Sequence, residues 1–273
     1  MRLAHISDLH FGAEDPDVVA GLRADLRGQE LSQVLLSGDL TMRARSGQFR
    51  QARELLDAVG RPWVSVPGNH DLPLDRPVLR GTRPLDGYRR LIDPETEPRV
   101  LRDGVLVVGL NTARPYLWKG GRIDPDQVAR IGGAFVSDQP VGLRVLMLHH
   151  PVFRSAQRPG ERIVRGAGPA LRAAAAAGVD VVLCGHDHVP ANADLSRVWP
   201  GVRRHMLGIM CGTTTSRRLR AGESQSYNIL DLTGDRLTLT VRQWRDGRFA
   251  EFSSTAWTRG PQGWLPISSS VDS

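Results

Sequence analysis

The sequence predicts an α/β protein in which a parallel or mixed sheet is followed by a second, antiparallel sheet. Three observations lead to this prediction. Short runs of Val, Leu and Ile recur along the first two-thirds of the chain. Helix-like stretches separate several of these runs. After about residue 200 the pattern changes to alternating apolar and polar residues.

The apolar runs predict strands that are buried on both faces, because neither face of such a strand needs polar residues. They span residues 2–7, 33–37, 62–66, 105–110, 144–148 and 179–184. Several of them lead directly into a cluster of Gly, Asn, Asp or His residues. We therefore expect buried strands whose carboxyl ends carry polar side chains.

Helices are expected over residues 17–30, 46–60, 124–135 and 168–178. Ser46 is expected to cap the start of the second helix, since a serine hydroxyl accepts hydrogen bonds from the first-turn N–H groups. Gly60 and Gly178 stand where the second and fourth helices should stop. Strands that alternate with helices indicate βαβ units and a largely parallel or mixed sheet.

Antiparallel strands are expected in the last quarter of the chain, where apolar and polar residues alternate around Gly-containing turns. These segments span residues 205–216, 226–234, 235–247 and 248–258. They are expected to form much of a second sheet against the first. The chain shows no internal repeat or low-complexity linker, so we expect one domain over 1–267 and a flexible C-terminal tail over 268–273.

The composition is that of a soluble globular protein, with 40% hydrophobic and 24% charged residues. No stretch approaches the length of an apolar transmembrane helix, and the N-terminus lacks the features of a signal peptide. A cytoplasmic location with no membrane partner is therefore expected. Cys184 and Cys211 lie in or after apolar segments, and we expect them to be buried free thiols.

The formal net charge is +7, and Lys119 is the only lysine among many arginines. A basic surface can attract nucleic acid. Here the arginines are scattered beside acidic residues or in helix-like segments, which favours solvated faces over a dedicated nucleic-acid stripe.

Metal-capable side chains follow five of the predicted strands. These clusters are Asp8 with His10, Asp39, Asn69 with His70 and Asp71, His149 with His150, and His186 with His188. They hold six of the eight histidines in the chain. In an open α/β sheet, ligands bind in the crevice at the carboxyl ends of the strands. We therefore expect all five clusters to meet at one edge.

The spacing within the clusters suits metal binding. In extended backbone, residues i and i+2 point to the same side, so Asp8 with His10 and His186 with His188 could each present two ligands together. Glycines at 38, 68 and 185 permit sharp turns or close approach of the backbone. Carboxylate and imidazole ligands without thiolate suit manganese, iron, zinc or cobalt, and two ions that share a bridging carboxylate would use so many ligands economically.

In order, these motifs are D-x-H, G-D, G-N-H-D, H-x-P and G-H-x-H, running from Asp8 to His188. This series resembles the signature of the calcineurin-like metallophosphoesterases. The opening "AHISDLHFG" and the context of "GNHD" are most similar to the bacterial Icc-type branch, which includes cyclic-nucleotide and broad phosphodiesterases. The resemblance implies a two-sheet mixed β-sandwich flanked by helices, in a four-layer αββα arrangement.

The resemblance also implies a site. Its first metal would be held by Asp8, His10, Asp39 and His188, and its second by Asp39, Asn69, His149 and His186. His70 would be catalytic, near the leaving group, with Asp71 as its orienting partner, whereas His150 would be a neighbour of the site. The stretch "GDLTMRA" lacks the tyrosine that purple acid phosphatases carry there, which argues against an Fe(III)–tyrosinate centre.

The implied activity is that of a dinuclear metal-dependent phosphodiesterase, in which a metal-activated hydroxide attacks a small diester such as a cyclic nucleotide or a glycerophosphodiester. Manganese and iron are the favoured metals, with zinc or cobalt as alternatives. An SbcD-like DNA nuclease, a phosphomonoesterase and a non-catalytic interaction module on the same fold are the other hypotheses. Segments 72–98, 111–124 and 153–168 are either substrate loops or plain surface loops.

Overall fold

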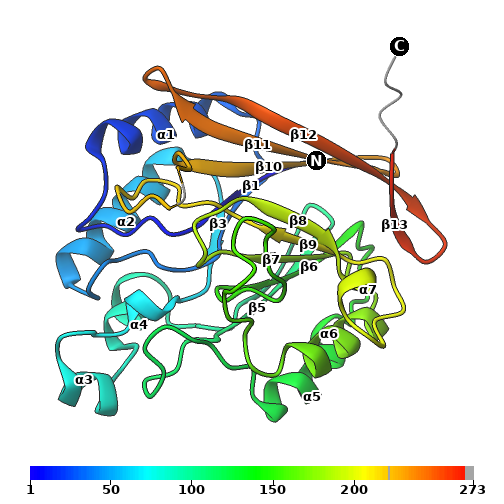
Figure 1. Ribbon diagram of the computed structural model, residues 1–273, viewed down its shortest axis with the longest axis horizontal. Coiled ribbons are helices and arrows are strands. Elements are labelled where there is room, and N and C mark those ends of the chain that lie inside the picture. The colour runs from blue at the N-terminus through cyan, green and yellow to red at the C-terminus, as the bar shows by residue number, and fades with distance from the viewer. Residues whose placement is uncertain (221, 268–273) are drawn as a thin grey trace.

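The computed structural model describes residues 1–220 and 222–267, which form two β-sheets with helices on their outer faces (Figure 1). The first sheet has seven strands in the order β13-β12-β11-β10-β1-β2-β3. These are β1 (Arg2–Ile6), β2 (Gln33–Leu36), β3 (Trp63–Ser65), β10 (Ser226–Thr233), β11 (Arg236–Arg245), β12 (Arg248–Gly260) and β13 (Gly263–Pro266). β2 pairs in parallel with β1 and with β3. The pairs β1–β10, β10–β11, β11–β12 and β12–β13 are antiparallel.

The second sheet has six strands in the order β4-β5-β6-β7-β9-β8. Its members are β4 (Arg99–Arg102), β5 (Val105–Leu110), β6 (Leu143–Leu148), β7 (Val181–Cys184), β8 (Ala191–Asp194) and β9 (Leu207–Met210). The four central strands run parallel, and β4 and β8 are antiparallel strands at the two edges. The described helices are α1 (Pro16–Gly28), α2 (Ser46–Val59), α3 (Pro77–Thr82), α4 (Asp86–Leu91), α5 (Pro125–Ala134), α6 (Ala167–Ala176) and α7 (Leu195–Val198), with a 3₁₀ turn at Asn69–Asp71.

The central core lies between the two sheets. Leu3 and Leu35 of the first sheet share one cluster of buried side chains with Val107 and Val145 of the second. Successive residues of a strand point to opposite faces, so Ala4 of β1 lies instead in the cluster on the outer side of its sheet. Strands buried in this way on both faces explain why their sequences are continuous apolar runs.

Two further cores lie between each sheet and its helices. Leu22 of α1 and Phe49 of α2 pack on the first sheet, whereas Ile131 of α5 and Leu171 of α6 pack on the second. The order of layers is helices, sheet, sheet, helices. The predicted four-layer αββα sandwich is therefore confirmed.

The predicted division of strands between the sheets is wrong. The C-terminal strands β10 to β13 do not form a sheet of their own, because β10 pairs with β1, with Leu230 opposite Leu3. Segment 205–216 contributes β9 to the other sheet, parallel to β7. β2 of one sheet and β5, β6 and β7 of the other are all largely apolar and buried on both faces, so their composition does not say which sheet they join.

The predicted helix ends are partly correct. Gly60 and Gly178 adopt left-handed backbone angles, with φ of 72° and 75°, just after α2 and α6. Ser46, however, is the first residue of α2 and not its cap. The Gln48 side chain instead accepts a hydrogen bond from the backbone N–H of Arg43 at 2.9 Å, just before the helix.

Some short elements have no counterpart in the predictions, among them α3 and α4 within segment 72–98. Helices of six residues carry too few turns for a clear periodicity. Cys184 and Cys211 are buried free thiols, as predicted. The predicted tail, 268–273, lies outside the described residues. Within residues 1–220 and 222–267, no helix is both long and apolar enough to span a membrane.

A buried carboxylate joins the two sheets away from the strand ends that carry the histidines. Asp180, just before β7, has a side chain only 2% exposed. Its Oδ1 accepts hydrogen bonds from Arg204 at 2.9 Å, from Arg259 of β12 at 3.0 Å and from the Trp264 indole of β13 at 3.2 Å. Its Oδ2 accepts from the backbone N–H of Arg144 at 2.9 Å.

We expect Asp180→Ala to lower the free energy of unfolding by about 3 kcal/mol, because it leaves the partly buried guanidinium of Arg204 without a carboxylate partner. Urea unfolding of the metal-free protein measures this loss. The control is Asp231→Ala, which removes a more accessible ion pair with Arg2 and should cost less than about 1 kcal/mol. Equal losses in the two variants would contradict the role given to Asp180.

Candidate metal centre

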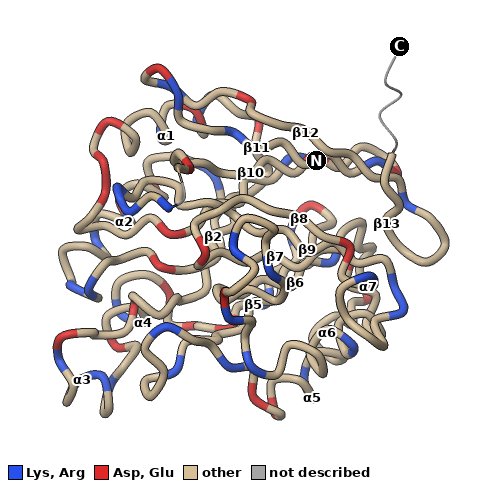
Figure 2. Tube along the Cα trace, viewed as in Figure 1, with Lys and Arg blue, Asp and Glu red and all other residues tan. Residues whose placement is uncertain are grey.

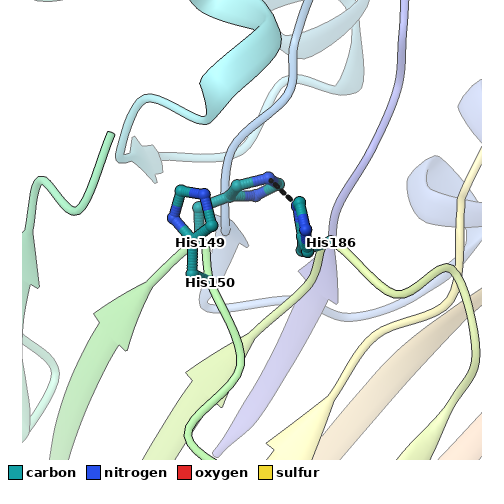
Figure 3. A group of neighbouring side chains, drawn as sticks. All are labelled: His149, His150 and His186. Carbon is teal, nitrogen blue, oxygen red and sulfur yellow. Dashed lines mark hydrogen bonds between the residues drawn. The ribbon is translucent and has the colours of Figure 1, made fainter. Parts of the chain in front are cut away.

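The five predicted clusters meet in one place, at the carboxyl ends of strands from both sheets. Asp8 and Asp39 follow β1 and β2 of the first sheet, and His149 and His186 follow β6 and β7 of the second. Figure 3 shows His149 and His150 beyond the end of β6, with His186 beside them. Contacts among these side chains join residues far apart in the chain, such as His10 and His188.

The backbone at the predicted ligands is unusual. Asp8, His10, Asp39, His186 and His188 all have positive φ, between 51° and 76°. Only a few per cent of non-glycine residues adopt this region, and such strain persists where the surrounding structure enforces it. The prediction that extended backbone aligns the i and i+2 side chains is therefore wrong. Tight left-handed turns beyond the strand ends direct Asp8 and His10 together.

The first group consists of Asp8, His10 and His188. The Asp8 Oδ1 atom lies 3.5 Å from His10 Nε2 and 3.2 Å from His188 Nε2, and the two Nε2 atoms are 3.1 Å apart. His188 Nδ1–H donates to the Arg218 carbonyl at 2.9 Å, so its Nε2 lone pair faces the group. Asp8 Oδ2 accepts from the Ser7 hydroxyl at 2.6 Å, whereas Oδ1 is buried without a hydrogen-bond partner.

The second group consists of Asp39, His149 and His186. Asp39 Oδ2 lies 3.3 Å from His149 Nε2, which is 3.3 Å from His186 Nδ1 (Figure 3). His149 Nδ1–H donates to the Ser37 carbonyl at 2.8 Å, which leaves its Nε2 lone pair facing inward. The same Asp39 oxygen is 3.7 Å from His10 Nε2. Asp39 therefore stands between the two groups, where a bridging carboxylate would lie.

Unsatisfied atoms indicate that these groups fit metal ions. Asn69 Oδ1, like Asp8 Oδ1, is buried without a hydrogen-bond partner. Buried polar atoms are normally paired, and lone pairs that face one another need a cation between them. All inward-facing donors are oxygen or imidazole nitrogen, and neither buried thiol belongs to the groups. This donor set suits first-row divalent metals.

The pKa values point the same way. Burial alone would raise the pKa of Asp8 and of Asp39, but the facing imidazoles hold both well below their usual range. Burial alone would lower the pKa of His149, but Asp39 raises it to about 10. The carboxylates therefore attract positive charge strongly. Because a metal must displace the proton of a histidine ligand, metal binding weakens as the pH falls.

His70 and Asp71 do not interact as the sequence predicts. The resemblance implies that Asp71 orients the His70 ring. The Asp71 carboxylate instead accepts hydrogen bonds from the backbone N–H groups of Leu40, Thr41 and Gly68 at 2.9 to 3.2 Å. Asp71 therefore fixes the loop that carries Asp39, and it does not orient His70. Burial and the charge of Asp39 raise the pKa of Asp71 to about 7. His70 Nδ1–H donates instead to the carbonyl of Met42 at 3.0 Å.

His150 lies beside the second group. Its Nδ1 forms a hydrogen bond with the Thr112 hydroxyl at 2.7 Å, and its ring centroid lies 4.8 Å from that of His186. His150 Nε2 is buried without a hydrogen-bond partner, and His150 can share an ion with His149 and His186. The sequence places it as a neighbour of the site, and that assignment stays a prediction.

A cavity of about 700 Å³ opens over both groups. Asp39, His70 and His186 contribute to its floor and walls. Segments 111–124 and 153–168, left open by the sequence, both line it, through Tyr116 to Gly121 and through Arg158 to Arg165. A third segment, which contains Arg218 and Arg220, also lines the cavity and was not predicted from the sequence. Its only sequence signal is the basic "RRLR" that directly follows the polar "GTTTS".

Known proteins are similar to this chain in sequence and in fold. A sequence model of the family described as calcineurin-like phosphoesterase matches residues 1–190. The chain belongs to this family. This phosphoesterase is therefore a metal-dependent hydrolase of phosphoesters, as the motif series predicts.

Named relatives of this phosphoesterase are distant. It is 26% identical over 199 residues to a "probable cyclic nucleotide phosphodiesterase" of Synechococcus sp., a match covering 69% of this chain and 73% of the relative. It is 37% identical over 83 residues to a glycerophosphodiester phosphodiesterase of Enterobacter lignolyticus, covering 26% of this chain and 30% of that protein.

Solved structures share the fold at low identity. A purple acid phosphatase from yellow lupin seeds superposes with a TM-score of 0.69 at 13% identity, covering 94% of this chain but only 53% of its own. A dimetal phosphatase from Danio rerio gives a TM-score of 0.63 at 15% identity, covering 92% of this phosphoesterase and 98% of the other chain.

Gly185 tests how closely the backbone packs on the centre. A Cβ atom there would lie 1.9 Å from the Ser7 hydroxyl oxygen and 2.6 Å from Asp8 Oδ2. We expect Gly185→Ala to displace Asp8 and to lower the free energy of unfolding by about 1–3 kcal/mol, as overpacking does. The rise in melting temperature on adding Mn²⁺ should also shrink.

The matched control is Gly28→Ala at the end of α1, where a Cβ would meet nothing within 4 Å. We expect it to leave the Mn²⁺ response unchanged and to be neutral or stabilising. Thermal unfolding with EDTA and with Mn²⁺ measures both effects. A Gly185→Ala protein with the stability and metal response of Gly28→Ala would refute the close packing.

Proposed function

We propose that this chain is a two-metal phosphodiesterase that hydrolyses a small diester of the cyclic-nucleotide or glycerophosphodiester type. The observation that carries the proposal is the pair of ligand groups on either side of Asp39, beneath a cavity of small-molecule size. The names of the two relatives support a diester substrate.

In this proposal each group holds one ion. The first ion would be held by Asp8, His10, Asp39 and His188, and the second by Asp39, Asn69, His149 and His186. Manganese or iron suits these ligands best, and zinc or cobalt is the alternative. When bound, two divalent ions supply a water of lowered pKa for the attack and offset negative charge on the phosphate oxygens.

His70 and Arg218 act from the cavity wall. In neutral His70, the hydrogen bond from Nδ1 to the Met42 carbonyl leaves Nε2 without a proton, and the Arg218 guanidinium lies 3.4 Å from that nitrogen. A protonated His70 would present an N–H at Nε2 and could donate to the leaving oxygen. Arg218 adds a fixed positive charge beside the same position, where it can bind a phosphate oxygen.

Several features favour a small diester over a nucleic acid strand. Loops from 111–124 and 153–168 enclose the cavity, and basic and acidic residues are interspersed over the fold in Figure 2. We also propose that residues 1–267 act as one domain, because the ligands come from both sheets. Asp8 and Asp39 follow strands of one sheet, and His149 and His186 follow strands of the other.

A substrate panel tests the proposal. Metal-free protein is reconstituted with Mn²⁺, Fe²⁺, Co²⁺ or Zn²⁺ and assayed on bis-p-nitrophenyl phosphate, p-nitrophenyl phosphate, cyclic AMP and single-stranded DNA. We expect the diesters to be hydrolysed faster than the monoester, and EDTA to abolish turnover. Faster hydrolysis of the monoester or of DNA would favour the phosphatase or nuclease alternative, and no hydrolysis with any metal would refute the enzymatic role.

We expect His70→Ala to lower kcat by about 10²–10⁴-fold while bound metal stays at the wild-type level, because general acid catalysis contributes about that much. Elemental analysis of the same samples supplies the metal content. His149→Ala is the comparison, since it removes a proposed ligand and should empty one site. Parallel loss of metal and activity in His70→Ala would show that His70 acts as a ligand instead.

A further inference from the structure

The cavity over the ligand groups is lined by more cations than one phosphodiester needs. Six basic residues line it, which are Lys119, Arg158, Arg162, Arg165, Arg218 and Arg220. Three acidic residues, Asp39, Glu161 and Asp187, also line it. Asp39 belongs to the ligand groups, and Glu161 already pairs with Arg158. A scissile diester carries a single negative charge, which two metal ions and Arg218 would more than offset.

Among the described residues, four of the five arginines that line the cavity form no ion pair, namely Arg162, Arg165, Arg218 and Arg220. The charge of Arg220 acts on Asp187 of the same cavity, but no carboxylate of the described residues lies at ion-pair distance from Arg220 or from Arg162. Arg162 and Arg220 lie on different segments, Arg162 in 153–168 and Arg220 in the loop between β9 and β10. Arginine binds phosphate oxygens through two parallel N–H groups, and a cationic cleft raises the local concentration of anions. These side chains are therefore available to a second anionic group of a bound molecule.

The rim of the same cavity carries an exposed aromatic pair. The side chains of Tyr116 and Trp118 are 62% and 60% exposed, although both are large and apolar. Asn69, a proposed metal ligand, donates from Nδ2 to the Trp118 carbonyl at 3.5 Å. The exposed indole therefore belongs to a segment in contact with the metal centre.

This rim is held in place from below. Arg80 of α3 is only 4% exposed, and it donates to the carbonyls of Pro115 at 2.8 Å and Leu117 at 2.7 Å. Its guanidinium also stacks 4.9 Å from the Trp118 ring centroid. A buried cation that fixes two backbone carbonyls and one face of an indole keeps the ring in a defined position. A nucleobase can stack on such a platform because every base has a π-face.

We propose that the substrate is a nucleotide-type diester that carries a further phosphate besides the scissile one, with its base on Trp118 and the further phosphate on Arg162 and Arg220. This inference rests on the proposed phosphodiesterase function and narrows its substrate class. A cyclic mononucleotide has no second phosphate and a glycerophosphodiester has no base, so each would leave one of these two features unused.

Three chromogenic substrates with the same leaving group separate the two features. Methyl p-nitrophenyl phosphate is a bare diester, thymidine 5′-(p-nitrophenyl phosphate) adds a nucleoside, and the 3′-phosphate of the latter adds the second anion. With Mn²⁺-loaded protein we expect kcat/KM to rise about tenfold at the last step, since a hydrogen bond to a charged group contributes about that much. The nucleoside step should raise it about fivefold through stacking.

Substitutions test which residues cause each of the two increases in kcat/KM. Arg162→Gln with Arg220→Gln should bring the ratio of kcat/KM between the last two substrates close to one, mainly by raising KM. Trp118→Leu should reduce the ratio at the nucleoside step. The matched control is Arg50→Gln with Arg61→Gln, which removes the same charge at exposed positions outside the cavity and should change neither ratio.

Binding gives an independent readout. Calorimetry on Mn²⁺-loaded protein should find a lower Kd for thymidine 3′,5′-bisphosphate than for thymidine 5′-monophosphate, and the arginine double variant should lose that difference. No preference for the second phosphate in either measurement, or a preference that survives the double variant, would overturn the inference while diester hydrolysis stands. If none of the three substrates is hydrolysed with any metal, the phosphodiesterase proposal fails, and the two Kd values still decide the anion subsite.

Discussion

The attraction between two buried carboxylates and the positive charge that neutralises them is the constraint on which this structure depends. Asp8 and Asp39 are no more than 1% exposed, just beyond the ends of the paired strands β1 and β2 of the first sheet. Carboxylates buried this deeply are costly unless they are paired or bind metals. Much of the local architecture serves this need, from the imidazoles that face the carboxylates to the carbonyl of Ser37, which orients His149.

The same constraint couples the centre to the packing of the sandwich. Both carboxylates come from the first sheet, and three of the facing imidazoles, those of His149, His186 and His188, come from the second. The sheets must therefore meet in one register for the groups to form. Close backbone approach makes this possible, since a Cβ atom at Gly68 would lie 2.1 Å from Asp39 Oδ1. The left-handed backbone at the ligand residues directs their side chains toward one another, at a cost in strain of order 1–3 kcal/mol per residue.

Local pattern predicted most strands and helices and the five clusters of metal-capable side chains, because apolar runs and polar strand ends are written in consecutive residues. The choice of seven ligands among these clusters came from the resemblance to the family. Pairing of β1 with β10 joins residues more than two hundred positions apart, and no local signal assigns β10 to that sheet. The direction of Asp71 toward backbone N–H groups likewise depends on the fold of the Asp39 loop. Arg218 and Arg220 became candidates only when tertiary structure brought their segment to the cavity wall.

Anomalous diffraction at the manganese edge, from crystals grown with Mn²⁺, tests directly whether the two ligand groups hold two ions. We expect two peaks roughly 3.5–4 Å apart, the usual separation in two-metal sites, with Asp39 between them. One peak should lie against Asp8, His10 and His188, and the other against Asn69, His149 and His186. A single peak, or ions bound elsewhere on the protein, would contradict this expectation.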